Sequence, residues 1–191
     1  AAAAEASAVV HLAAQVAVTT SLADPVTDFA VNLGSTVTLL EALRRRADPP
    51  PLIFASTNKV YGDLADLTFR RDGEAYVPAD PEILAHGIGE ERSLDFHTPY
   101  GCSKGAADQY VRDYARIYGL RTAVFRQSCI YGPHQFGIED QGWVAWFVIA
   151  AVLSRPVTIY GTGRQVRDLL WVDDLCAAYW RAWQKGAGGE I

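Results

Sequence analysis

The chain has 191 residues, of which half are hydrophobic and a fifth are charged, and its formal net charge is −5. This length suits one domain with a sizeable core, or one domain and part of another. The acidic balance, without a basic cluster, argues against nucleic acid as a partner. The longest apolar run, residues 143–153, is too short to cross a membrane, which takes roughly 20 residues.

The spacing of cysteines and histidines excludes two further classes of site. The three cysteines lie far apart and form no Cys-x-x-Cys pair, so the sequence predicts neither a disulfide framework nor a zinc site. No pair of histidines has the spacing of metal ligands, and we expect no bound metal. A reducing cytoplasm is the natural setting for such a chain.

Short apolar runs and amphipathic segments alternate along the first half of the chain. Residues 7–12 and 52–56 are typical of buried parallel strands, and residues 28–46 between them have apolar side chains at helical spacing. Residues 64–92 are polar and weakly periodic, which favours an excursion over the surface.

The second half continues the alternation. We expect, in chain order, a helix, a strand, a helix, a short strand and a final helix at residues 98–118, 121–126, 142–153, 157–160 and 173–185. Gly119 can end the first of these helices in a left-handed turn, and Asp140 can cap the second. The pattern predicts an α/β fold with a Rossmann-type, doubly wound parallel sheet. Ligands of such sheets lie at the carboxyl ends of the strands.

The helix at 98–118 carries Tyr100 and Lys104 four residues apart, so that the two side chains lie one above the other. An ammonium near a phenol lowers the phenol's pKa from about 10, which gives a general base suited to taking a proton from an alcohol. The pair alone is weak evidence, because Tyr-x-x-x-Lys also occurs as an exposed pair without a role.

Two strand ends supply further groups at the same edge of the predicted sheet. Ser56 and Thr57 follow the second strand, and the Thr57 hydroxyl can align a substrate alcohol with Tyr100. A plain Ser/Thr turn is the alternative. The first strand ends in small residues, Ala13 and Ala14, that let a flat ligand approach; simple helix–sheet packing would also account for them.

Five motifs follow one another in order along nearly the whole chain after Ala8. They are Val10-His11-Leu12-Ala13-Ala14, Ser56-Thr57-x-x-Val60-Tyr61-Gly62, Tyr100-x-x-x-Lys104, Arg126-x-x-x-x-Tyr131-Gly132-Pro133, and Arg167-Asp168 followed by Val172-Asp173-Asp174-Leu175. In this combination they resemble the extended short-chain dehydrogenase/reductase family of NAD-dependent epimerases and dehydratases.

The resemblance implies NAD as cofactor and a nucleotide sugar as substrate. The catalytic residues would be Thr57, Tyr100 and Lys104. Thr57 and Tyr100 hold a sugar hydroxyl, Tyr100 removes its proton, and Lys104 keeps Tyr100 anionic and reaches the nicotinamide ribose. The residues expected at the cofactor are Leu12, Ala13, Ala14, Asn32, Ser56, Tyr100, Lys104 and Ser128. Those expected at the substrate are Thr57, Cys129, Trp143 and Arg167.

Three of these residues have simpler readings. The Asn32 amide could satisfy helix or loop backbone, Arg167 could pair with Asp168 on the surface, and Trp143 could belong to a hydrophobic core. The family resemblance favours the binding roles.

Residues 56–63, and residues 128–136 with 140–147, resemble the subgroup of the family that inverts C2 of a CDP-linked deoxyhexose. The implied reaction is transient oxidation to a keto-sugar and return of the hydride to the other face. A 4,6-dehydratase is disfavoured because Asn58 and Lys59 stand where it would carry an acid. A UDP-sugar 4-epimerase and a non-catalytic dinucleotide-binding relative remain alternatives.

The sequence departs from the family at its start. No Gly-rich turn for the pyrophosphate precedes the first strand, and the acid for the adenosine ribose is also absent. Both ends look cut, as if a new strand began at 188–191. We therefore expect a fragment that neither holds NAD tightly nor turns over unaided.

The expected organisation is a partial NAD-binding domain at 1–131, part of a substrate-binding domain at 132–171, and a helix returning to the first domain at 172–191. The complete protein is expected to be a homodimer.

Overall fold

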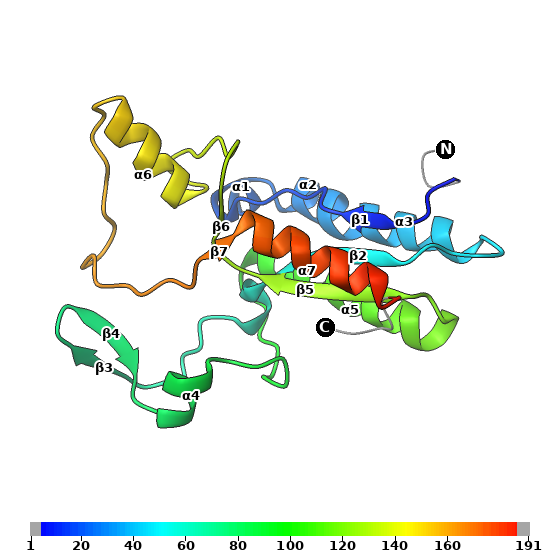
Figure 1. The fold of residues 1–191 in the computed structure, drawn as a ribbon, viewed down its shortest axis with the longest axis horizontal. Coiled ribbons are helices and arrows are strands. Elements are labelled where there is room, and N and C mark those ends of the chain that lie inside the picture. Colours follow the sequence, from blue (N-terminus) through cyan, green and yellow to red (C-terminus); the bar gives the residue numbers. More distant parts are fainter. Residues whose placement is uncertain (1–4, 187–191) are drawn as a thin grey trace.

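The computed structural model describes residues 5–186 and is built around a parallel three-stranded sheet (Figure 1). Its strands are β1 (Val9–His11), β2 (Leu52–Thr57) and β5 (Thr122–Gln127), in the order β1-β2-β5. Val9 pairs with Leu52, which pairs with Thr122, so the three strands run in step. The strands predicted at 7–12, 52–56 and 121–126 are confirmed, and β1 lies at an edge of the sheet.

Helices cover both faces of the sheet, as the prediction of a doubly wound fold requires. Leu52 and Phe54 of β2 pack in one core cluster with α3 (Ser35–Arg44) and α5 (Thr98–Tyr118). Ile53, which points the other way, packs with α7 (Val172–Gln184). Because successive side chains of a strand alternate between faces, a strand covered on both sides is apolar throughout.

The helix α5 has the predicted bounds. Its buried stripe recurs at helical spacing, and Gly119 ends it with φ 68°, the left-handed conformation that glycine adopts most easily. The Gly119 N–H donates to the Ala115 carbonyl at 3.1 Å. This helix therefore presents Tyr100 and Lys104 from a rigid element.

The helix predicted at 28–46 begins earlier and contains an irregular turn. It comprises α2 (Pro25–Phe29), a π-helical turn, η2 (Ala30–Gly34), and α3, and a short helix α1 (Val18–Ala23) precedes it. The start was predicted three residues late because Asp24, which accepts the Thr27 N–H at 3.0 Å, is the capping residue.

Residues 64–92 form the predicted surface excursion, with structure of their own. They hold a hairpin, β3 (Phe69–Asp72) and β4 (Ala75–Pro78), followed by α4 (Pro81–His86). Every residue of β3 is exposed.

The segment after β5 differs from the prediction in two places. Helix α6 (Trp143–Val152) is present, but its N-cap is Gly142 and no side chain caps it, so the role given to Asp140 is wrong. The strand expected at 157–160 is also wrong, because these exposed residues have no partner strand. Instead β6 (Ile130–Tyr131) pairs with β7 (Leu170–Trp171), which leads into α7.

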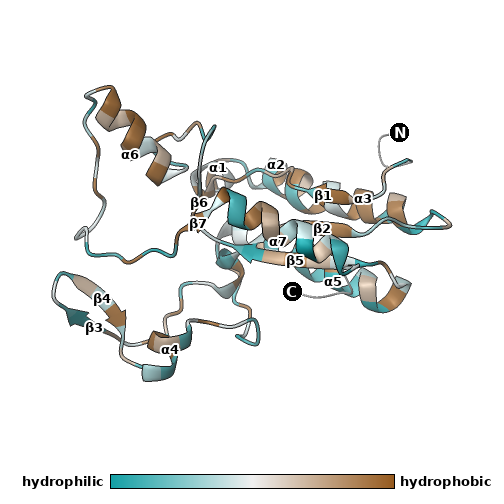
Figure 2. Ribbon diagram, viewed as in Figure 1, coloured by the Kyte–Doolittle hydropathy of each residue, from teal (hydrophilic) through white to brown (hydrophobic). Residues whose placement is uncertain are grey.

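Figure 2 shows the strongly apolar α6 standing away from the sheet, with Val148 and Val152 exposed. Apolar character does not make it a membrane segment: between residues 5 and 186, no helix combines the length and hydropathy that a bilayer span needs. The strand expected to begin at 188–191 lies outside the described residues.

Candidate active site

The predicted catalytic residues meet at the carboxyl edge of the sheet. Thr57 is the last residue of β2 and pairs in register with Gln127 of β5, while Tyr100 and Lys104 come from the first two turns of α5. All three side chains belong to buried residues. The residues at the carboxyl ends of neighbouring parallel strands share one edge, where α/β proteins bind their ligands.

Thr57 connects this edge to Tyr100. Its hydroxyl accepts the Lys59 N–H at 3.2 Å, which starts the 3₁₀ turn η3 (Asn58–Tyr61). The same hydroxyl lies near enough to the Tyr100 phenol to lower the pKa of that group. The pair can hold one substrate hydroxyl between a threonine and a tyrosine oxygen. This is the arrangement that the sequence predicts.

The protonation of Tyr100 is opposite to the prediction. Burial raises its pKa above the usual value of 10, the hydrogen bond with Thr57 opposes the rise, and the charge of Asp28 adds to it. The phenol is therefore protonated at neutral pH in this structure.

Lys104 explains the difference. Its Nζ donates to the Ala55 carbonyl at 2.5 Å and lies 4.4 Å from the centroid of the Phe54 ring, so the side chain runs into the sheet rather than towards the phenol. Burial lowers its pKa to about 8, and the carboxylates of Asp108 and Asp28 oppose that change. The prediction that Lys104 lowers the pKa of Tyr100 is wrong for this structure, because the ammonium has other partners.

Asn32 lies behind the first strand's loop in a buried polar cluster. Its Oδ1 accepts the Gln15 N–H at 2.8 Å, and its Nδ2 donates to Asp28 Oδ1 at 3.1 Å and to Ser103 Oγ at 3.0 Å. Asn32 thus fixes the loop that contains Leu12–Gln15 against α5. In this structure protein groups satisfy the Asn32 amide. One of them is a loop backbone N–H, as in the alternative to a cofactor-binding role.

Ser56 points away from the edge into a second buried cluster. Its hydroxyl donates to Asp108 Oδ2 at 2.7 Å, and Arg126 contacts both oxygens of that carboxylate at 3.0 Å. Arg126 also donates to the Tyr61 hydroxyl at 3.0 Å. The Ser56 side chain is thus engaged in the protein interior, which leaves its backbone as the part that faces the edge.

The sequence analysis did not single out the acids Asp28 and Asp108. Both have no exposed surface, although charged residues are rarely buried without a partner. Asp108 lies four residues after Lys104 on the apolar face of the helix, and Asp28 lies four residues before Asn32. A carboxylate within a helix's apolar stripe is the signal that could have found them.

His97 connects the two segments that carry Thr57 and Tyr100. The imidazole of His97, the N-cap residue of α5, contacts Asp63 at 2.9 Å and Asp95 at 3.1 Å. The hydrogen bond with Asp63 and the charge of Asp95 raise the pKa of His97. The His97 side chain is exposed, and its contacts join the loop after η3 to the start of α5.

The remaining predicted residues are spread more widely. Leu12 and Ala13 are exposed after β1, and Ser128 and Cys129 lie half-buried directly after β5, at the same edge. Trp143 begins α6, which stands away from the sheet in Figure 1, and Arg167 lies in the segment that leads into β7. Trp143 packs edge-on against Phe147, with centroids 5.7 Å apart, within its own helix.

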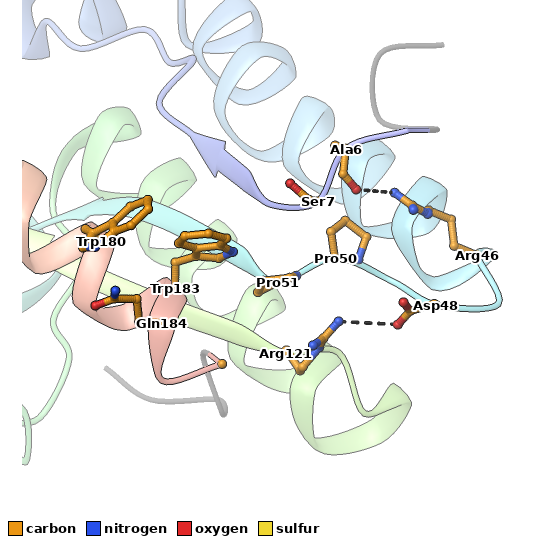
Figure 3. Close-up of a pocket in the computed structure, with 11 residues that line it drawn as sticks. Ala6, Ser7, Arg46, Asp48, Pro50, Pro51, Arg121, Trp180, Trp183 and Gln184 are labelled. Carbon is orange, nitrogen blue, oxygen red and sulfur yellow. Dashed lines mark hydrogen bonds and ion pairs between the residues drawn. The ribbon is translucent and has the colours of Figure 1, made fainter.

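A hollow lies at the opposite end of the strands. Ser7, Pro51 and Arg121, which line it, come just before β1, β2 and β5, and Trp180 and Trp183 of α7 form its wall (Figure 3). It contains none of the predicted catalytic groups. The candidate site is therefore the carboxyl edge, which the two buried clusters support.

Comparison with known proteins agrees with this geometry. The model of the NAD dependent epimerase/dehydratase family matches residues 1–191. CDP-paratose 2-epimerase of Salmonella typhi is 50% identical over 177 residues, which cover 90% of this chain and 52% of that protein. A putative UDP-glucose 4-epimerase of Methanocaldococcus jannaschii is 31% identical over 171 residues, which cover 89% and 50%.

Solved structures show the same fold. The UDP-glucose 4-epimerase of Thermotoga maritima, solved with UDP-glucose, has a TM-score of 0.74 at 30% identity and covers 92% of this chain and 51% of its own. The Thermus thermophilus UDP-glucose 4-epimerase, solved with NAD, has a TM-score of 0.74 at 32% identity and covers 93% and 53%. The chain thus spans about half the length of the relatives it matches.

Proposed function

Because the chain belongs to the NAD-dependent epimerase/dehydratase family, we propose that the whole protein is a sugar-nucleotide epimerase whose catalytic residues are Thr57, Tyr100 and Lys104. The observation that carries the proposal is the meeting of buried Thr57, at the carboxyl end of β2, with buried Tyr100, and the buried Lys104 one helical turn further on. A protein that only binds a dinucleotide has no need of all three.

The residues at the edge suit a dinucleotide. The small, exposed Ala13 after β1 leaves room for a flat ring, and the half-buried Ser128 after β5 offers a hydroxyl at the same edge of the sheet. When bound there, NAD supplies a hydride acceptor and a positively charged nicotinamide ring.

The reaction follows from the positions of the chain's own groups. Thr57 and Tyr100 orient one hydroxyl of the sugar, and Tyr100 takes its proton as the carbon loses a hydride. The keto-sugar then rotates in the site and regains the hydride on its other face. Tyr100 returns the proton to the sugar oxygen. Burial keeps the phenol protonated in this structure, so proton abstraction needs a positive charge closer to Tyr100. Lys104 would supply it if its ammonium left the Ala55 carbonyl and moved towards the phenol.

The substrate we propose is a CDP-linked deoxyhexose, which the protein inverts at C2. The Salmonella typhi relative is named for this reaction on CDP-paratose. The 50% identity to that CDP-paratose 2-epimerase supports this choice over a UDP-sugar 4-epimerase, whose relatives are near 31%. Asn58 and Lys59, both exposed after Thr57, supply no carboxyl group for the water elimination of a dehydratase.

The test compares the whole protein with its Tyr100→Phe and Tyr110→Phe variants on CDP-paratose, with the product's configuration read by NMR. Tyr110 lies on the same helix with its side chain exposed, so it controls for the loss of a phenol. We expect Tyr100→Phe to lose about 10²–10⁴-fold in turnover while still binding NAD, and Tyr110→Phe to be unchanged.

Undiminished turnover in Tyr100→Phe would falsify the catalytic assignment. Inversion at C4 of UDP-glucose, with CDP-paratose untouched, would instead identify the 4-epimerase.

The proposal extends to the organisation of the whole protein. We keep the division into residues 1–131, 132–171 and 172–191, with Arg167 and Trp143 meeting the substrate from the second part. The exposed Tyr110 and Ile117 on the outer face of α5 suit pairing of two copies, which light scattering of the whole protein would test. A cytoplasmic setting fits three free cysteines, of which Cys102 and Cys176 are exposed.

A further inference from the structure

Asp28 is a buried acid that the proposed reaction does not use. Its carboxylate has no exposed surface and receives two hydrogen bonds, from Asn32 Nδ2 at 3.1 Å and from the Ser103 hydroxyl at 2.5 Å. The first donor comes from the π-helical turn η2 and the second from α5, between Tyr100 and Lys104. Asp28 therefore joins the helix behind β1 to the turn that carries the catalytic pair.

The charge of Asp28 has no direct ion pair. Within residues 5–186 no arginine, lysine or histidine forms a salt bridge with it, and a buried charge without such a partner is costly. The charge of Asp28 acts through space on the Lys104 ammonium, whose charged form it stabilises after Asp108. The same carboxylate disfavours the ionised form of Tyr100.

We propose that Asp28 is a positioning residue for the Tyr100–Lys104 pair, acting as the counter-charge of Lys104 and, through Ser103, fixing the turn from which both side chains project. The inference rests on the proposed roles of Tyr100 and Lys104. It adds an acid to that site which holds the lysine charged inside the protein and holds the phenol neutral.

The other groups that face the pair do not replace Asp28. Asp108 has the larger effect on the charged Lys104, but its carboxylate is already held by Arg126 in a bidentate pair. His11 of β1 faces Lys104 from the sheet, and burial and the ammonium both lower its pKa, so the ring is neutral. Thr57, which faces Tyr100 from β2, is uncharged.

The test removes the charge of Asp28 and keeps its shape. In the whole protein, Asp28→Asn retains two hydrogen-bonding positions, because the new amide can donate to Ser103 Oγ and its carbonyl can accept from Asn32. The titrations of ¹³C-labelled lysine Cε and tyrosine Cζ are followed by NMR without substrate, with Lys104→Arg and Tyr100→Phe used for assignment. Asp113→Asn, an exposed acid on the same helix, is the matched control.

Two outcomes separate a counter-charge from a structural role. If Asp28 is the counter-charge, the titration midpoints of both Lys104 and Tyr100 fall, since the cation loses an attraction and the phenolate loses a repulsion. If Asp28 only holds the fold together, loosening exposes both groups; Tyr100 then falls towards its ordinary value, while Lys104 rises towards 10.5. A Lys104 midpoint that rises or stays unchanged overturns the proposal.

A second variant covers the case in which Asp28→Asn does not fold. Ser103→Ala keeps the carboxylate and removes its strongest donor, so the charge acts more fully on Lys104 and the midpoint stays or rises; a fall overturns the proposal. These titrations need no turnover. An inactive wild-type protein that shows the expected shifts would defeat the proposed function and leave this inference standing.

Discussion

Lys104 should make the free protein less stable at neutral pH than a methionine would. Burial lowers the pKa of Lys104 from 10.5 to about 8 in the folded protein, whereas in the unfolded chain the group is solvated and keeps its ordinary value. Between pH 8 and pH 10.5 the unfolded chain then binds more protons, so stability rises with pH across this window. Below pH 8 the full cost of burying the charge is present.

The size of the effect follows from the two values. A lowering from 10.5 to about 8 corresponds to about 3 kcal/mol at pH 7, at about 1.4 kcal/mol for each tenfold change in proton affinity. Methionine keeps most of the apolar stem but loses the hydrogen bond to the Ala55 carbonyl, which costs about 1 kcal/mol. We therefore expect Lys104→Met to stabilise the free protein by about 2 kcal/mol at pH 7 and by almost nothing at pH 10.

The assay is urea unfolding of the whole protein at pH 7 and pH 10, without NAD. Lys59→Met, which changes an exposed lysine after β2, should show no such difference between the two pH values. If Lys104→Met were less stable than the wild type at pH 7, or if its effect were the same at both pH values, the reasoning from burial would be refuted. The expected result would mean that the lysine is kept for function at a cost in stability.

Two further predictions concern the packing behind the site. Asp108→Leu leaves the buried Arg126 guanidinium unpaired and should cost about 3–5 kcal/mol in urea unfolding, and adding Arg126→Met should recover most of it; a loss below about 1 kcal/mol would show that the pair is not buried in solution. Gly105→Ala places a Cβ 2.4 Å from the Phe96 ring and should destabilise by about 1–3 kcal/mol. Gly34→Ala, whose Cβ would meet only a backbone oxygen at 3.8 Å, should stabilise by about 0.5–1 kcal/mol; similar effects of both changes would contradict the packing seen here.

Local pattern determined the parts of the fold that were predicted correctly. The helix at Thr98–Tyr118 was predictable because its apolar stripe and Gly119 are both local signals, and β2 because Leu52, Ile53, Phe54 and Ala55 form a short apolar run. The strand expected at 157–160 failed for a non-local reason. Its β-branched and aromatic residues suit a strand, but strand formation requires a partner, and here these residues have none.

The same division holds for the site. That Thr57, Tyr100 and Lys104 share one edge follows from strand ends and helix spacing, which sequence contains. The direction of the Lys104 side chain depends on the Ala55 carbonyl and the Phe54 ring, which come near only when α5 packs on β2. The protonation of Tyr100 depends on burial, so a rule based on sequence neighbours alone gave the wrong direction.

The two buried acids differ in how their charges are compensated, and this difference decides what each can do. Arg126 neutralises Asp108 within the protein, so that carboxylate mainly ties β5 to α5 beneath Ser56. Asp28 accepts hydrogen bonds but, within residues 5–186, forms no salt bridge, so its field reaches Lys104 and Tyr100. Near this negative charge the neutral phenol resists ionisation until further positive charge arrives at the edge. In a site built this way, ionisation of the Tyr100 phenol would depend on the binding of a cationic ring. Proton abstraction would then begin only once an acceptor for the hydride is in place.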